Sequence, residues 1–257
     1  MYIDTHTHLY IENFDEDRDE VIAKCKSLGV TKLFLPNIDA TTLTSVKELA
    51  AKYPDMCFAM NGLHPCYVKE NVEDVLMELR EGFEKYEFVA VGEIGIDFYW
   101  DTSFAEEQIY AFKKQIAWSS ELGIPFVIHS RSSLDLTIRI VSDANCKPDQ
   151  CIFHCFDGTI EQANKIIGLG MKMGIGGPIT YKKSKLKEVI NKVGLEHIVL
   201  ETDSPYLTPS PYRGERNESS YIPLIAKRIA EIKEISVEEV AEVTSRNAER
   251  IFGNIAV

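Results

Sequence analysis

The side chains that can do chemistry recur in short polar segments at the ends of apolar runs. The set comprises His6, His8, Glu93, His129, His154 and Asp203. Imidazole nitrogens and carboxylate oxygens ligate divalent zinc, manganese, magnesium or nickel, and the sequence does not choose among these metals. A bound cation lowers the pKa of its water toward ~7, which makes hydroxide available at neutral pH. The residue types therefore predict a metal-dependent hydrolase.

Each of these residues taken alone has an ordinary structural explanation. A single histidine at a strand end is usually hydrogen-bonded, and Asp203 alone fits a helix N-cap before Ser204 and Pro205. Six such groups on one rim would be costly to bury without cations to balance them. Four histidines and two carboxylates are enough for two divalent cations with one carboxylate shared between them.

The elements that must position these residues alternate along the chain. Strands are predicted at 2–6, 31–36, 56–61, 88–93, 125–129, 151–155, 171–175 and 197–202. Helices are predicted at 15–28, 41–53, 70–86, 103–122, 133–144, 159–169, 183–193 and 219–232, with a further helix at 236–252. In the first helix the apolar residues Val21, Ile22, Cys25 and Leu28 recur at helical spacing before Gly29.

Eight strands, each followed by a helix, predict parallel strands with right-handed crossovers. A chain of 257 residues has the usual length of an eight-fold barrel. We therefore expect one α/β domain over residues 1–257, a TIM-type (β/α)8 barrel, with an open doubly wound sheet as the second choice. The polar residues then map to the carboxyl ends of the strands, where barrels build their active sites.

Strand alternation refines the expected site. His6 and His8 should share one face, and Glu93 should continue an inward row that begins with Val89 and Val91. By the same rule His154 faces inward with Ile152, and Cys155 points the other way. Glu201 aligns with Asp203 and is expected to be a buried carboxylate below the site.

Composition limits the classes of function. The net charge of −12 argues against broad wrapping of a nucleic acid but leaves a small substrate or one end of a polyanion possible.

The start of the chain, Met1 to Tyr10, lacks the apolar run of a secretion signal, and no apolar stretch approaches the ~20 residues of a membrane helix. The six cysteines form no paired motif and fit a reducing compartment. We expect a cytoplasmic protein with no membrane association and no obligate protein partner.

The ordered motifs of this chain resemble the TatD family of metal-dependent deoxyribonucleases among the amidohydrolase-type barrels. They are Ile3–His8, Gly62–Pro65, Val91–Asp97, His129–Arg131, His154–Phe156, Glu201–Leu207 and Arg213–Glu218. The Gly-Glu-Ile-Gly and Glu-Thr-Asp segments, followed by the Arg-Asn-Glu loop, are specific to that family. The resemblance covers essentially the whole chain and implies hydrolysis of DNA, often as a 3′–5′ exonuclease on single strands.

The resemblance also implies roles for single residues. His6, His8 and Asp203 would hold one metal, His129 and His154 a second, and Glu93 would bridge the two. Asp203 would also orient or deprotonate the attacking water, and His64 would contact the scissile phosphate. Catalytic roles are thus expected for Asp203, Glu93 and His64. The chain departs from the family at Ser132 and Ser133, where an acidic residue is usual, at Glu215, where a basic residue is frequent, and at Ser219, where proline is frequent.

Substrate contacts are expected from the loops around this rim. Arg131 beside His129, and Arg213 and Arg216 after the last strand, are candidate phosphate ligands. A lysine run at Lys182, Lys183, Lys185 and Lys187 fits either a phosphate site or a solvated helix face. Phe98, Tyr99 and Trp100 could stack a base or pack at the rim.

Two other functions remain open at this point. The same hydroxide could attack an ester or amide, as in removal of a misacylated amino acid from tRNA by a D-aminoacyl-tRNA deacylase. A non-catalytic metal-binding interaction module is a third possibility. Complete ligands at all six positions argue against the third, because a scaffold does not need open coordination sites.

Overall fold

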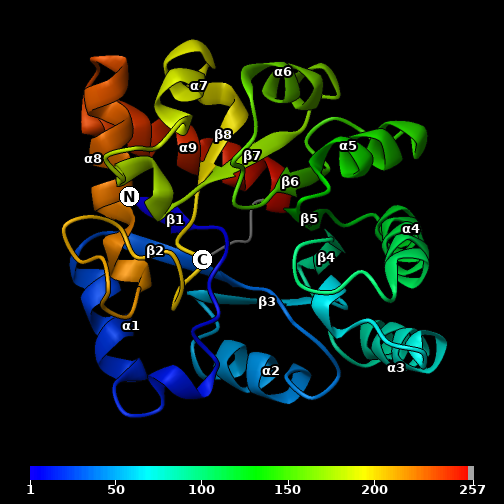
Figure 1. Cartoon of the computed structure of the whole chain (residues 1–257). Helices are drawn as coiled ribbons and strands as arrows, with labels where there is room; N and C mark the ends of the chain where they lie inside the picture. Colours follow the sequence, from blue (N-terminus) through cyan, green and yellow to red (C-terminus); the bar gives the residue numbers. More distant parts are fainter. Residues whose placement is uncertain (254–257) are drawn as a thin grey trace.

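Eight parallel strands lie side by side in chain order and form a barrel, surrounded by helices (Figure 1). The computed structural model describes residues 1–253. The strands are β1 (Tyr2–Asp4), β2 (Val30–Leu35), β3 (Cys57–Asn61), β4 (Ala90–Asp97), β5 (Phe126–Arg131), β6 (Cys151–Phe153), β7 (Lys172–Ile175) and β8 (Ile198–Leu200). The first and last strands meet where the Thr5 amide donates to the Leu200 carbonyl at 3.0 Å and where Thr7 bridges Ser204. The predicted (β/α)8 barrel is confirmed, and the alternative of an open sheet is wrong.

The helices follow the strands as the sequence pattern predicts. They are α1 (Arg18–Ser27), α2 (Leu43–Lys52), α3 (Val72–Lys85), α4 (Ala105–Leu122), α5 (Leu134–Asp143), α6 (Ile160–Gly168), α7 (Leu186–Lys192), α8 (Ile222–Lys233) and α9 (Val237–Phe252). Short 3₁₀ helices lie at Glu12–Phe14, Pro65–Tyr67, Gly177–Thr180, Leu195–His197 and Ser219–Tyr221. Thr159 caps α6 in a reciprocal box with Gln162, and Gly123 ends α4 with a φ of 68° that favours glycine.

Strand lengths differ from the prediction where the site is built. β1, β6 and β8 end before His6, His154 and Thr202, because these residues leave the sheet at the barrel mouth. β4 runs longer than predicted, since Ile94–Asp97 continue to pair with Ile128–Arg131 of β5. The predicted helix 219–232 begins as a 3₁₀ turn before α8.

The core has two layers, one inside the barrel and one between strands and helices. Val127, Ile152 and Val199 are among the fully buried residues of the inner layer. Helix α9 closes this layer, because Phe252 stacks on Phe34 with ring centroids 3.8 Å apart. In Figure 1 this helix crosses behind the barrel. It therefore closes the end opposite the carboxyl ends of the strands.

Two expectations about the whole chain concern cysteines and membranes. All six cysteines are free thiols, and Cys25, Cys57 and Cys151 are buried. Within residues 1–253, no helix has the length and apolar character required to cross a bilayer.

Candidate metal centre

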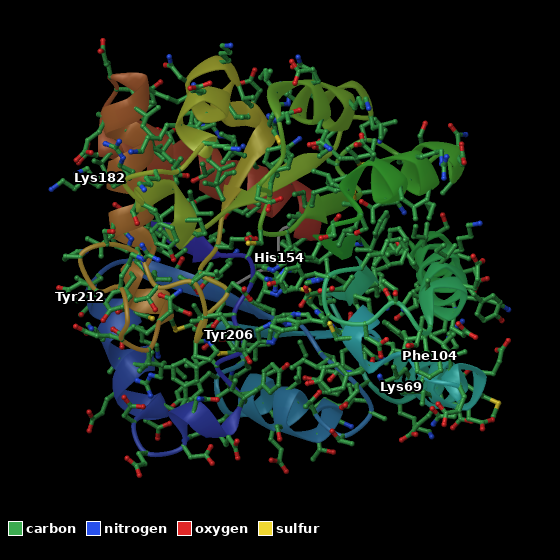
Figure 2. All side chains as sticks on the ribbon, viewed as in Figure 1. Lys69, Phe104, His154, Lys182, Tyr206 and Tyr212 are labelled. Carbon is green, nitrogen blue, oxygen red and sulfur yellow. The ribbon has the colours of Figure 1, made fainter. Side chains whose placement is uncertain are left out.

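The predicted ligands gather at the carboxyl ends of the strands, and His154 lies near the middle of the barrel in Figure 2. The structure brings together all six predicted metal ligands, which come from positions 6 to 203 of the chain. His64, predicted only as a phosphate contact, joins the same cluster.

Glu93 is the centre of this cluster and is 2% exposed. Its Oε2 lies 3.2 Å from His6 Nε2 and 3.8 Å from His8 Nε2. Its Oε1 faces the other histidines, at 2.9 Å from His129 Nδ1 and 3.7 Å from His154 Nε2. The two oxygens of the Glu93 carboxylate therefore face two different groups of imidazoles.

Glu93 faces inward as predicted, but the row of inward residues from which this was predicted, Val89 and Val91, is wrong. Val91 packs in the outer layer of the core, and its neighbour Ala90 faces the barrel interior. The register of β4 against β5 shifts between Val91 and Ile94, so Glu93 does not continue the row of Val91. The shift turns the carboxylate inward.

Histidines surround Glu93 closely enough to control its charge. Burial alone would raise the pKa of Glu93, but the surrounding imidazoles hold it well below its usual range. Burial also opposes ionisation of Asp203, yet His154 and the other imidazoles lower its pKa. Both carboxylates are therefore anionic and available to a cation.

His6 provides the clearest test of whether a cation fits. Its side chain is fully buried, and neither ring nitrogen makes a hydrogen bond of good geometry with the described residues, although Glu93 Oε2 lies 3.2 Å from Nε2. The ring stacks on His154 with centroids 3.5 Å apart, and burial lowers its pKa. Buried polar atoms normally find a partner. A divalent cation would give His6 Nε2 that partner.

His8 is oriented by a residue that sequence reasoning missed. The Tyr10 hydroxyl donates to the Pro36 carbonyl at 2.7 Å and lies 3.0 Å from His8 Nδ1. Because that hydroxyl hydrogen is used, Nδ1 is the donor in the second contact. His8 Nε2 therefore carries a lone pair directed toward Asp203, whose Oδ1 lies 3.6 Å away.

Asp97 plays the same part for His129 and was also missed as a site residue. Its Oδ2 lies 2.9 Å from His129 Nε2, and its Oδ1 accepts the backbone amides of Tyr99 and Trp100. Burial would lower the pKa of His129, but Asp97 and Glu93 raise it to about 9. Asp97 stands four residues after Glu93 on β4, and that even spacing was the available signal.

Glu201 lies under His154, as expected from its alignment with Asp203. It is 1% exposed, and its Oε1 is 3.0 Å from His154 Nδ1. Burial opposes a charged imidazole, yet Glu201 and Glu93 raise the pKa of His154 to about 10. A Cβ at Gly174 would come within 2.0 Å of Glu201 Oε2, so only glycine leaves room for this carboxylate.

Cys155 lies beyond the end of β6, where strand alternation no longer applies. Its thiol, a nitrogen of His154 and an oxygen of Glu201 lie within 4.8 Å of one another. The strand has already ended at Phe153, and Cys155 has a φ of 46°. The direction of this side chain is therefore set by the turn after β6, and the thiol lies near Glu201.

His64 sits deeper in the centre than a surface phosphate contact would. Its Nε2 is 3.2 Å from His129 Nδ1 and 3.7 Å from Glu93 Oε1. Its Nδ1 accepts the Cys66 amide at 3.1 Å, so Nε2 carries the ring proton when the imidazole is neutral. Burial lowers the pKa of His64 to about 3, which keeps the ring neutral.

The three arginines predicted to bind phosphate have different surroundings. Arg216 forms a two-point ion pair with Asp17 at 2.5 and 2.8 Å and donates to the Asn13 carbonyl. That guanidinium ties the loop after β8 to the segment before α1. Arg213 lies over the Tyr181 ring at 4.1 Å, and Arg131 is the last residue of β5, at the mouth of the barrel.

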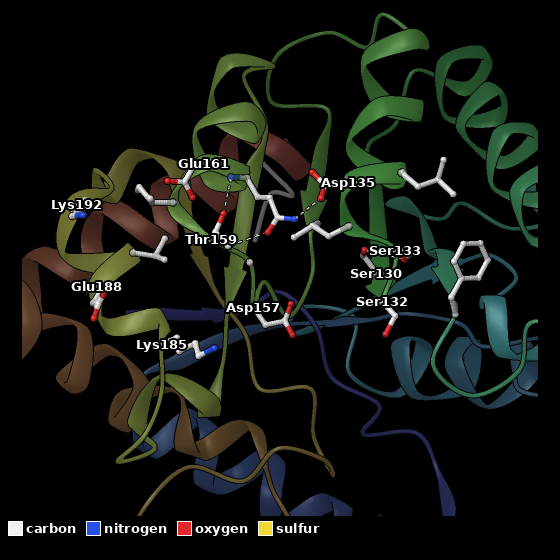
Figure 3. A pocket seen from close by; sticks show the side chains of 17 residues that line it. Ser130, Ser132, Ser133, Asp135, Asp157, Thr159, Glu161, Lys185, Glu188 and Lys192 are labelled. Carbon is white, nitrogen blue, oxygen red and sulfur yellow. Dashed lines mark hydrogen bonds between the residues drawn. The ribbon is translucent and has the colours of Figure 1, made fainter.

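A cavity of 930 Å³ opens beside the metal centre (Figure 3). It lies between the segments after β5 and β6 and helix α7, and Ser130, next to His129, forms part of its wall. Its charged lining residues are Asp135, Asp157, Glu161, Glu188, Lys185 and Lys192. Four carboxylates and two lysines make it an acidic cavity.

Comparison with known proteins places the chain in a family. The sequence matches the model of TatD related DNase over residues 3–253. It is 36% identical to the uncharacterized metal-dependent hydrolase YabD of Bacillus subtilis, over 98% of this chain and 99% of that protein. It is 31% identical to the 3′–5′ ssDNA/RNA exonuclease TatD of Pantoea ananatis, over 98% of this chain and 99% of that protein.

A solved structure has the same architecture. The crystal structure of YjjV, a TatD homologue from Escherichia coli, superposes with a TM-score of 0.92 at 29% identity, covering 99% of this chain and 98% of that one. The family model, the relatives and the fold agree over nearly the full length. The chain belongs to the TatD family of metal-dependent hydrolases.

Proposed function

We propose that this chain is a nuclease that hydrolyses phosphodiester bonds at the 3′ end of single-stranded DNA. The observation that carries the proposal is the arrangement of Glu93, whose two oxygens face separate groups of histidines. That arrangement supports two divalent cations bridged by one carboxylate. Relatives named as 3′–5′ ssDNA/RNA exonucleases, at about 30% identity, support the substrate and the polarity.

The proposed ligand sets are those that the family resemblance implies. His6, His8 and Asp203 would hold one cation, His129 and His154 would hold the other, and Glu93 would be shared between them. Divalent cations in these sets would supply hydroxide at neutral pH and offset the charge of the phosphoryl group. Zinc, manganese, magnesium and nickel all suit nitrogen and oxygen donors.

The protein's own residues do the rest. Of the two carboxylates in the centre, Asp203 is more exposed than Glu93, with 15% of its side chain accessible against 2%. Asp203 accepts the proton of the attacking water. His64, kept neutral by burial, donates its Nε2 hydrogen to an oxygen of the scissile phosphate. Arg131 and Arg213 remain as phosphate ligands, whereas Arg216 is left out because Asp17 already binds it.

A second function is favoured by the acidic cavity beside the centre. Its carboxylates outnumber its lysines, which suits the ammonium group of an amino acid better than a phosphate. This supports the alternative of an ester hydrolase that removes an amino acid from tRNA. The metal centre would serve that reaction equally well.

One experiment separates the two functions. The chain is reconstituted with each metal and assayed on single-stranded DNA, duplex DNA, RNA, aminoacyl-tRNA and simple esters. We expect the fastest cleavage on single-stranded DNA, with mononucleotides released from the 3′ end. Cleavage of esters without cleavage of any nucleic acid would reject the nuclease and favour the deacylase.

A further inference from the structure

Two large aromatic side chains stand at the rim of the metal centre without being buried. Tyr99 is 57% exposed and Trp100 is 68% exposed, whereas Phe98 packs against the core. The three residues therefore separate into one that packs and two that do not. Single exposed aromatics are common on protein surfaces, so exposure alone assigns no function.

A guanidinium group organises this pair. Arg131 lies 3.9 Å from the Tyr99 ring centre and 5.1 Å from that of Trp100. The two rings meet edge to face at 4.9 Å and 87°. Tyr99 has its face covered by the guanidinium, and Trp100 remains the more exposed ring. A cation beside an open aromatic face is the combination that binds the bases and backbone of single strands.

The pair is also fixed to the metal centre by one carboxylate. Asp97 Oδ1 accepts the amides of Tyr99 and Trp100 at 2.9 and 3.1 Å. Asp97 Oδ2 lies 2.9 Å from Nε2 of the metal-centre residue His129. The aromatic segment and His129 are therefore held by the same buried side chain, so their relative position is set before any substrate binds.

Charge distinguishes the cavity from the Tyr99–Trp100 pair as the place where a substrate strand would lie. The 930 Å³ cavity on the far side of Ser130 carries the excess of carboxylates and repels a polyanion. The aromatic pair instead has the Arg131 guanidinium against it. A strand with charged phosphates is therefore favoured along the aromatic side.

We propose that Tyr99, Trp100 and Arg131 form a platform on which an unpaired base of the substrate strand stacks while its neighbouring phosphate enters the metal centre. The proposal rests on the nuclease function above and adds the residues that position the strand. Trp100 is the stacking surface, Arg131 orients the rings, and Asp97 ties both to His129.

Tryptophan fluorescence tests the platform directly. The chain contains two tryptophans, and Trp118 on α4 is only 8% exposed, so ligand-dependent quenching reports on Trp100. The full-length, metal-loaded protein is titrated with a phosphorothioate oligothymidylate, which resists cleavage, and with an abasic oligomer of equal length and charge. We expect quenching by the thymidylate and little quenching by the abasic oligomer.

Substitution supplies the second measurement. Trp100→Ala should weaken binding of the thymidylate by about 5- to 150-fold, the equivalent of ~1–3 kcal/mol for one stacked base. It should not change binding of the abasic oligomer. Trp100→Phe should retain most of the affinity. Met77→Ala removes a comparably exposed apolar side chain on α3 and serves as the control. On cleavable single-stranded DNA, Trp100→Ala should raise KM and leave kcat unchanged.

The outcomes separate the platform from the nuclease function. Equal affinities for the two oligomers, or a Trp100→Ala variant that binds like Met77→Ala, would overturn the platform even if the wild type cleaves DNA. Base-dependent quenching in a protein that hydrolyses no nucleic acid would retain the platform and overturn the nuclease. Absence of both quenching and cleavage would overturn both.

Discussion

Replacing Asp97 by asparagine should weaken metal binding without unfolding the barrel. Asp97 is 1% exposed and accepts three hydrogen bonds, two from backbone amides and one from His129 Nε2. Asparagine keeps one oxygen, which satisfies the two amides, and turns an NH₂ group toward the imidazole. His129 Nε2 must then accept a hydrogen, so the remaining ring proton moves to Nδ1.

That exchange of tautomers is what makes the substitution informative. His129 Nδ1 faces Glu93 at 2.9 Å and is the nitrogen that would ligate a cation. A proton on Nδ1 removes its lone pair. Loss of such an outer carboxylate typically lowers metal affinity 10- to 100-fold. By the conversion of 1.4 kcal/mol per factor of ten, this corresponds to about 1.4–2.8 kcal/mol of binding free energy.

The assay is a competition between the protein and a chromophoric chelator for zinc or manganese. The matched control is Asp101→Asn, which removes a carboxylate four residues further on that contacts Lys69 at the surface. Circular dichroism and thermal melting of both variants check the fold. We expect Asp101→Asn to bind metal as tightly as the wild type. Equally tight binding by Asp97→Asn would refute the role of Asp97 in setting the His129 tautomer.

Four further predictions follow from the structure. Glu93→Ala and Asp203→Ala should each abolish hydrolysis while near-ultraviolet circular dichroism stays native, and residual metal-stimulated cleavage in either variant would contradict their roles. Thorough chelation should remove activity, and return of a divalent cation should restore it; undiminished cleavage after metal removal would refute metal dependence. Arg216→Ala should leave KM for DNA unchanged and cost about 0–1 kcal/mol of stability, since it breaks a partly exposed ion pair with Asp17, and a raised KM would restore it as a phosphate ligand. Phe252→Ala should lower the free energy of unfolding by about 3–5 kcal/mol in urea titrations, because it empties the space under Phe34, and a loss below 1 kcal/mol would show that α9 does not close the barrel.

The sequence by itself determined the barrel and the position of its polar residues. Apolar runs with helical or alternating spacing are local properties, so eight strand and helix pairs could be predicted within a few residues of their observed bounds. Residues that follow parallel strands gather at one end of a barrel whatever its details. For this reason His6, His154 and Asp203 could be brought together without a structure.

Tertiary structure decided which atoms face each other. The inward turn of Glu93 depends on a register shift between β4 and β5 that no alternation rule contains. The pairing of Arg216 with Asp17 joins loops about two hundred residues apart, so the sequence could not show that this arginine was already bound. Asp97, Tyr10 and Glu201 set the histidine nitrogens through contacts of about 3 Å. Side-chain roles of this kind depend on distances between separate strands, and only the closed barrel fixes those distances.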